Sequence, residues 1–334
     1  MDREFARSGL RTTTLGFGAA PLGNIFREIS TADSHAMVHA AWNSGIRLYD
    51  TAPMYGHGLS EHRLADALFE YPRDEYVLVT KVGRRLQPAA PGTFDHGVWV
   101  KVPPMRSDFD YSYDGTYRQV EESLQRMMSD RFDVLLVHDI DRFTHGDAQP
   151  QRFAEAVAGS FKALLEMRDA GTVKAIGVGV NEHDVCYNVA QAVDIDCLLL
   201  AGRYTLLEQE ALNDLLPLCE ERKISVILGG VLNSGILATG NTPGAKYNYA
   251  PAPQHVRDKV DKIEAVCREF NVALPAAAMQ FAAAHPAVVN VCIGARSMDQ
   301  WAANFSYLNT PIPGEFWQQL VTQGLIRDDA PLPA

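Results

Sequence analysis

Four side chains in the first half of the chain are of types that together can reduce or oxidise a carbonyl group. They are Asp50, Tyr55, Lys81 and His138. Carbonyl reduction needs a hydride donor, a proton donor and a group that holds the developing oxyanion. Tyr55 can supply the proton, and His138 can donate a hydrogen bond to the substrate oxygen. In the reverse direction, Tyr55 becomes the base that oxidises an alcohol.

The protonation of Tyr55 is central to this hypothesis. The pKa of free tyrosine is about 10, too high for ready proton transfer at neutral pH. We expect the Lys81 ammonium to lower the pKa of Tyr55, and Asp50 to pair with Lys81 and hold it in place. A single Asp, Lys or His at a strand end is usually structural. Four such residues at or beside consecutive strand ends favour a catalytic group instead.

The elements that would position these residues are strand-like runs alternating with helical patterns. Continuously apolar runs rich in β-branched residues are typical of parallel strands buried on both faces. They span residues 15–19, 46–50, 76–81, 132–138, 174–180, 195–201, 224–229 and 288–294. Amphipathic stretches at residues 116–129, 153–170, 209–222 and 256–270 predict helices between them. Eight such repeats predict an α/β fold, a (β/α)8 TIM barrel forming one domain over residues 1–334.

An open doubly wound sheet is the rival fold. It needs a glycine-rich phosphate turn after its first strand, and here Pro21 stands where the third glycine belongs, after Gly16 and Gly18. We therefore reject it. Three long connections, at residues 84–113, 140–151 and 230–253, follow strand ends and would lie at the mouth of a barrel. The first contains Phe94 and Trp99, which could wall a substrate pocket or simply pack in a surface flap.

Composition and charge limit the classes of binding partner and indicate the cellular compartment. The net charge of -11 argues against nucleic acid or an anionic membrane as a partner. The first ten residues carry charges where a signal peptide needs an apolar core, and no apolar run reaches the length of a membrane span. Five scattered cysteines predict reduced thiols, and together these features predict a cytoplasmic protein. His35 and His39 stand four residues apart, but we expect no metal site there.

Several segments resemble those of the aldo-keto reductases. Residues 48–56 (LYDTAPMYG), 79–82 (VTKV) and 135–138 (LLVH) resemble the segments that carry the family's active-site residues. Residues 171–178 and 294–297 resemble its fifth strand and a late cofactor loop. The resemblance implies a (β/α)8 barrel with NAD or NADP bound across its mouth. It places cofactor contacts at Asn181, Gly294, Arg296, Gln300 and Asn304.

Residues 15–24 and 200–209 resemble a bacterial branch of that family. The branch includes L-fucose and D-threo-aldose 1-dehydrogenases and pyridoxal 4-dehydrogenases, which oxidise a cyclic hemiacetal to a lactone. The resemblance implies oxidation at C1 of an aldose of the L-fucose, D-arabinose or L-galactose type. Pyridoxal oxidation, NADPH-dependent reduction of aldehydes or ketones, and a cofactor-sensing subunit remain alternatives. We expect a small-molecule partner and a monomer or homodimer.

The cofactor loop also indicates which cofactor is preferred. NADP carries an extra phosphate that Arg and Lys recognise best. Family members that prefer NADP place a Lys early in this loop and an Arg four residues before the asparagine matching Asn304. Here those positions are Gly294 and Gln300, which leaves Arg296 as the cation of the loop. The resemblance therefore implies that NAD is preferred, with NADP possible.

Overall fold

Eight parallel strands close into a barrel in the computed structural model, which describes residues 2–333. Around the barrel, the strands follow one another in chain order. They are β3 (Leu15–Gly18), β4 (Leu48–Asp50), β5 (Val77–Val82), β8 (Val134–His138), β9 (Ala175–Val180), β10 (Cys197–Ala201), β11 (Ser225–Gly229) and β14 (Val288–Ile293). All eight predicted strands are confirmed, and so is the (β/α)8 barrel.

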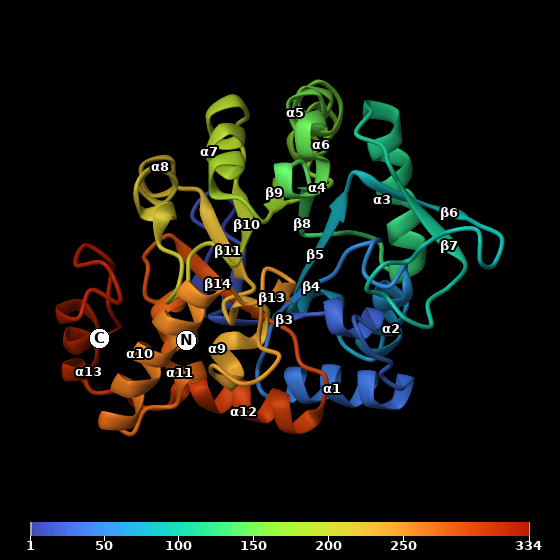
Figure 1. The fold of residues 1–334 in the computed structure, drawn as a ribbon. Helices are drawn as coiled ribbons and strands as arrows, with labels where there is room; N and C mark the ends of the chain where they lie inside the picture. The colour runs from blue at the N-terminus through green and yellow to red at the C-terminus, as the bar shows by residue number, and fades with distance from the viewer. Residues whose placement is uncertain (1, 334) are drawn as a thin grey trace.

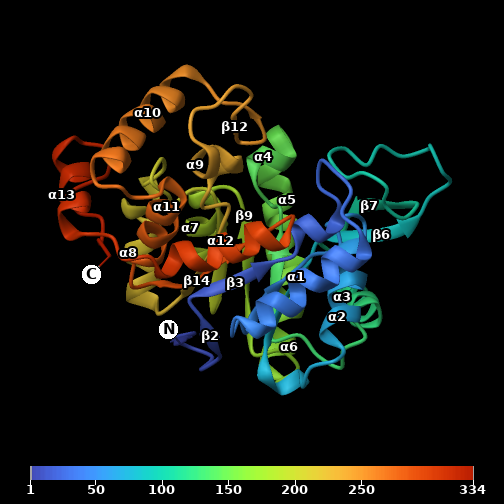
Figure 2. The same ribbon diagram turned by 90° about the horizontal axis from the view of Figure 1, so that it is seen from below.

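Helices surround the barrel and run between its strands (Figures 1 and 2). They are α1 (Thr31–Asn43), α2 (Leu59–Leu68), α3 (Tyr113–Met127), α5 (Gln149–Ala156), α6 (Lys162–Asp169), α7 (His183–Ala192), α8 (Leu215–Arg222), α10 (Gln254–Glu269), α11 (Leu274–Ala283), α12 (Met298–Asn309) and α13 (Gly314–Thr322). Their apolar faces pack against the outer faces of the strands in one large core. This packing leaves the strand ends and their loops to build a site.

Two predicted helices are interrupted. The stretch at 153–170 forms α5 and α6, joined by a π turn at Val157–Phe161. Inside that turn, a Cβ on Gly159 would lie 2.2 Å from the Tyr111 carbonyl oxygen, so only glycine allows this close approach. The stretch at 209–222 is a 3-10 turn (Glu210–Leu212) followed by α8. Periodicity located these helices but could not show the breaks, because tertiary packing produces them.

The alternation of side chains along each strand determines which residues fill the interior of the barrel. Side chains of a strand point alternately to its two faces, so every second residue lies inside the barrel. The interior cluster contains Leu48 of β4, Val77 and Val79 of β5, and Val134 and Leu136 of β8. The next inward positions on the same three strands are Asp50, Lys81 and His138. The period of two therefore places these polar residues directly above an apolar plug.

The three long connections carry structure of their own. Residues 84–113 contain a hairpin of β6 (Arg84–Pro88) and β7 (Met105–Phe109), which projects at the right of Figure 1. Residues 140–151 contain α4 (Arg142–His145), and residues 230–253 contain α9 (Ile236–Thr239), β12 (Lys246–Tyr247) and β13 (Ala250–Pro251). The other end of the barrel is covered by β1 (Asp2–Glu4) and β2 (Arg11–Thr13), with Phe5 in the interior cluster.

Two expectations from composition can be compared with the fold. All five cysteines are free and buried, as the sequence predicts. Among residues 2–333, no helix is both long enough and apolar enough to cross a membrane.

Candidate active site

An ion pair between Asp50 and Lys81 lies at the mouth of the barrel. The Lys81 Nζ donates to Asp50 Oδ1 at 2.7 Å and to the Thr51 carbonyl oxygen at 2.8 Å. Lys81 is 1% exposed and Asp50 is 4% exposed. On β9, two strands further round the barrel, a Cβ on Gly179 would lie 3.4 Å from the Lys81 Cε, which is van der Waals contact, so the lysine stem passes close to this glycine. Lys81 is therefore buried and held by two acceptors.

Tyr55 is brought over this pair by the loop that follows β4. Gly23 and Gly56 let two loops touch, since a Cβ on Gly56 would lie 2.4 Å from the Gly23 carbonyl oxygen. The Tyr55 N–H donates to the Ala52 carbonyl at 3.0 Å, which closes the turn. The Lys81 Nζ lies 4.7 Å from the Tyr55 ring centre. The Tyr55 and His138 rings meet edge to face at 5.9 Å. The structure thus brings all four predicted residues together.

The protonation of this group differs from the expectation in one respect. Burial, followed by the Asp50 and Asp139 carboxylates, raises the pKa of Tyr55 well above its ordinary value. The expectation that this pKa is lowered is wrong for the free protein, because burial and the two carboxylates all raise it. Burial also raises the pKa of Asp50, against the opposing effect of Lys81. Burial and then Lys81 hold the pKa of His138 well below its usual range, so its ring is neutral.

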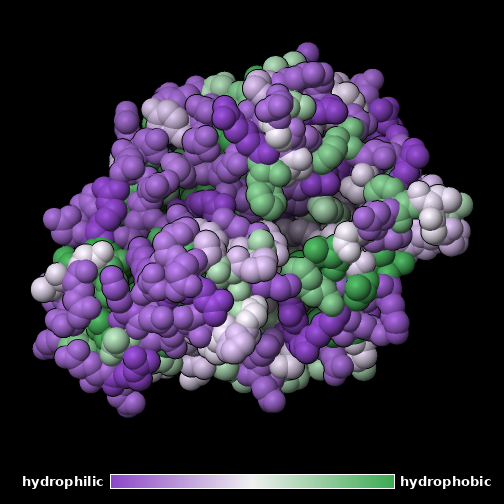
Figure 3. Space-filling view, viewed as in Figure 1, coloured by the Kyte–Doolittle hydropathy of each residue, from purple (hydrophilic) through white to green (hydrophobic). Residues whose placement is uncertain are grey.

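Aromatic rings stand around the mouth, and only some were predicted. Trp99 packs on Tyr55 with ring centres 5.8 Å apart. Its Nε1 is buried without a hydrogen-bond partner among the described residues. Phe94 instead packs on His57 and His96, with ring centres 5.8 and 5.5 Å apart. Figure 3 shows apolar side chains beside a hollow near the middle of this largely hydrophilic face.

Two further rings at the mouth were missed. Phe143 and Tyr249 lie with ring centres 6.2 Å apart, on the second and third long connections. Tyr249 stands close enough to Tyr55 to add to the rise in its pKa. The sequence located both connections at the mouth, but nothing in the residue pattern distinguishes these two rings from other loop aromatics.

The predicted cofactor residues gather at the same end of the barrel. Asn181 follows β9, and Gly294 follows β14. The Arg296 guanidinium lies over the Phe26 ring, with 5.6 Å between its central carbon and the ring centre. No carboxylate among the described residues pairs with Arg296. Its backbone N–H donates to the Gln300 side chain at 2.9 Å.

The start of α12 completes this loop. Ser297 caps the helix by accepting from the Gln300 N–H, and Asn304, one turn on, is 8% exposed. An unpaired, half-buried guanidinium beside a helix N-terminus suits an anionic group. The residues present therefore fit a nicotinamide dinucleotide, whose phosphates Arg296 and the N-terminus of α12 would hold.

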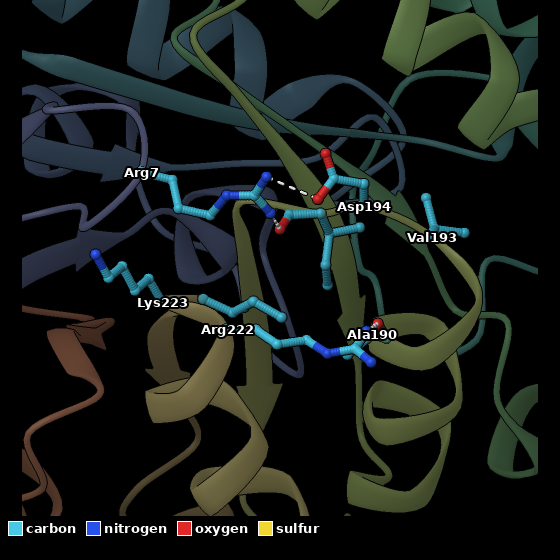
Figure 4. Close-up of a pocket in the computed structure, with 8 residues that line it drawn as sticks. Arg7, Ala190, Val193, Asp194, Arg222 and Lys223 are labelled. Carbon is cyan, nitrogen blue, oxygen red and sulfur yellow. Dashed lines mark hydrogen bonds and ion pairs between the residues drawn. The ribbon is translucent and has the colours of Figure 1, made fainter.

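A pocket of about 400 Å³ lies at the opposite end of the barrel (Figure 4). Its arginines are already engaged: Arg7 pairs with Asp194 at 2.7 Å, and Arg222 donates to the Ala190 carbonyl at 2.6 Å. These contacts tie the N-terminal segment to the loop before β10 and α8 to α7, which is a structural role. His35 pairs with Asp66, and the described residues contain no cluster suited to a metal ion.

A closed (β/α)8 barrel with Asp, Tyr, Lys and His converging at the carboxyl ends of its strands is the architecture of a barrel oxidoreductase. The family model described as "Aldo/keto reductase family" matches residues 14–322. The chain therefore belongs to the aldo/keto reductase family and is an NAD(P)-dependent oxidoreductase.

Named relatives and solved structures extend this finding. The chain is 43% identical to a pyridoxal 4-dehydrogenase of Microbacterium luteolum, over 97% of each chain. It is 39% identical to a D-threo-aldose 1-dehydrogenase of a Pseudomonas species, over 96% of this chain and 97% of the other. A holo aldo-keto reductase from Bacillus halodurans shares the fold, with a TM-score of 0.73 at 24% identity over 98% of this chain and 96% of the other. The predicted bacterial branch is thereby confirmed.

Proposed function

We propose that the protein oxidises the hemiacetal form of an aldose at C1 to the lactone, and that Asp50, Tyr55, Lys81 and His138 carry out the reaction. The convergence of these four residues in the barrel mouth carries the proposal. The similarity to the D-threo-aldose 1-dehydrogenase supports the substrate class. An indole face at Trp99 can stack on the apolar face of a sugar ring.

Each of the four residues has its own role in the proposed reaction. His138 is neutral, so it can donate to the substrate oxygen without carrying a charge. Tyr55 takes the proton of the anomeric hydroxyl during oxidation and returns it during reduction. Lys81, held by Asp50, faces the Tyr55 ring with its positive charge. A bound oxidised nicotinamide would accept the hydride, and its positive charge would favour the tyrosinate.

Pyridoxal is a second candidate substrate. The observation in its favour is the 43% identity to a pyridoxal 4-dehydrogenase. Pyridoxal also forms a cyclic hemiacetal, so the same four residues can serve both reactions. A flat pyridine ring would stack on Trp99 as well as a sugar does.

Three finer points belong to the same proposal. NAD is preferred over NADP, because Gly294 and Gln300 offer no cation to the extra phosphate of NADP and Arg296 is the cation of that loop. Trp99 and Phe94 line the substrate pocket. The protein acts in the cytoplasm, which the five free thiols support, since reducing compartments keep thiols unpaired.

A substrate panel tests the proposal. The purified protein is incubated with NAD and, separately, with L-fucose, D-arabinose, L-galactose and pyridoxal, and reduced cofactor is followed by absorbance. We expect turnover with at least one hemiacetal and loss of it in the Tyr55→Phe variant. Much faster NADPH-dependent reduction of simple aldehydes than oxidation of any hemiacetal would show instead a general reductase. Cofactor binding without turnover on any substrate would favour a sensing subunit.

A further inference from the structure

Asp139, the residue after His138, is held in a conformation that its neighbours enforce. Its φ is 54°, in the left-handed region that side chains other than glycine seldom adopt and that Asp and Asn tolerate best. Its N–H donates to the Gly179 carbonyl at 3.1 Å. The Tyr111 hydroxyl lies 3.0 Å from the carbonyl oxygens of both His138 and Asp139. The turn after β8 is therefore pinned from two sides.

The two carboxylate oxygens of Asp139 have different partners. Arg84 donates to Oδ2 twice, from Nε at 2.8 Å and from a terminal nitrogen at 2.7 Å. Arg84 begins the β6–β7 hairpin, and its guanidinium lies over the Phe109 ring at 4.3 Å. The other oxygen, Oδ1, lies 3.4 Å from the His138 Nε2. Asp139 thus binds Arg84 through Oδ2, while its Oδ1 faces the His138 ring.

The surroundings of the ring decide which nitrogen carries the proton. His138 is neutral, because burial and the charges of Lys81 and Arg84 disfavour a second proton, so one nitrogen is N–H and the other is a bare acceptor. The Nδ1 atom is enclosed and has no hydrogen-bond partner among the described residues. A proton on Nδ1 would be a buried donor without an acceptor, whereas a proton on Nε2 lies beside the Asp139 carboxylate, whose negative charge attracts it.

We propose that Asp139, clamped by Arg84, is a positioning residue of the active site that keeps the His138 proton on Nε2. A substrate can meet the ring only through Nε2, since Nδ1 is enclosed. With the proton on Nε2, His138 donates to the substrate oxygen; with the proton on Nδ1, it would present a lone pair to that oxygen instead. The inference rests on the proposed role of His138 and adds the residue that makes the role possible.

The Asp139→Asn variant gives the sharpest test. Arg84 has only donors, so it would take the amide oxygen and turn the amide NH2 toward His138. Nε2 would then have to accept, and the ring proton would move to Nδ1. Asn keeps the size of Asp and tolerates the left-handed backbone. The Asp108→Asn variant is the matched control, because Asp108 pairs with Arg106 on the same hairpin at 2.9 Å.

Nitrogen-15 NMR of histidine-labelled protein reads the tautomer directly. The chain has ten histidines, and a His138→Gln variant identifies the signal of His138. We expect the Nε2–H form in wild type and in Asp108→Asn, and the Nδ1–H form in Asp139→Asn. In Asp139→Asn, kcat for hemiacetal oxidation should fall about 10²-fold with a smaller change in KM, the usual cost of losing one donor to the developing oxyanion.

The outcomes separate this inference from the proposed function. A wild-type proton on Nδ1 would overturn the inference whether or not Asp139→Asn folds. So would an unchanged tautomer in folded Asp139→Asn. The predicted tautomers in a protein that oxidises no hemiacetal would support the positioning role and reject the proposed substrate. Unchanged melting temperature and NAD binding in Asp139→Asn show that the lost rate is not a loss of fold.

Discussion

Removing the charge of Lys81 should cost stability as well as activity. In Lys81→Met, the Asp50 carboxylate stays buried but loses its ammonium partner, which lies 2.7 Å away in the native protein. Breaking a buried ion pair from one side costs about 3–5 kcal/mol. With an unfolding entropy of about 2 cal/mol/K per residue, a chain of this length loses roughly 4–7 °C of melting temperature.

The pH dependence of that loss follows from Asp50. Burial already raises the pKa of Asp50 in the folded protein, and Lys81 opposes the rise. When the pKa of a carboxyl group is higher in the folded than in the unfolded protein, its protonated form stabilises the fold at low pH. That contribution to the free energy of unfolding is lost as the pH rises through the folded-state pKa. Without Lys81 the pKa of Asp50 climbs further. The deficit of Lys81→Met relative to wild type should therefore be larger at pH 8 than at pH 5.

A double-mutant cycle measured by thermal unfolding checks this reasoning. Adding Asp50→Asn to Lys81→Met removes the uncompensated charge, so the double variant should recover much of the lost melting temperature. The surface pair of Arg152 and Glu155 is the control, and Arg152→Met should cost less than about 1 kcal/mol. If the double variant is no more stable than Lys81→Met at either pH, the ion pair is not the source of the loss.

Three further predictions concern the reaction and the cofactor. Tyr55→Phe should lower kcat by about 10²–10⁴-fold with NAD binding retained, and turnover within a few-fold of wild type would refute its role. Because the pKa of His138 is held well below its usual range, rate–pH profiles should show no break near 6.5; such a break, lost in His138→Gln, would contradict a neutral ring. Fluorescence titration should show NAD binding about ten-fold or more tighter than NADP, and tighter NADP binding would refute the argument from Gly294 and Gln300.

The sequence predicted the barrel and the convergence of the four residues because both follow from short-range regularities. Continuous apolar runs indicate buried parallel strands, and the carboxyl ends of such strands meet at one mouth. The period of two then turns Asp50, Lys81 and His138 inward. These relations depend on residue order alone, so they are visible before any tertiary contact is known.

The contacts that tune the site depend on loops and could not be predicted in this way. The clamp of Arg84 on Asp139 joins a hairpin to a strand end 55 residues later. The left-handed backbone of Asp139 has no sequence signal beyond the tolerance of Asp for that region. From the sequence, Lys81 is the one charge placed beside Tyr55, and it predicts a lowered pKa. Its direction depends on burial and on two carboxylates that the fold brings close.

The most direct test of the proposed reaction follows the hydrogen at C1. Each aldose of the panel is labelled with deuterium at C1 and incubated with NAD and the protein, and both products are examined by mass spectrometry. We expect an unlabelled lactone and one deuterium in the reduced nicotinamide ring, and neither product when Tyr55→Phe replaces wild type over the same time. Reduced cofactor without deuterium, or an oxidised product that retains it, would show that the hydride does not come from the anomeric carbon and would contradict the account.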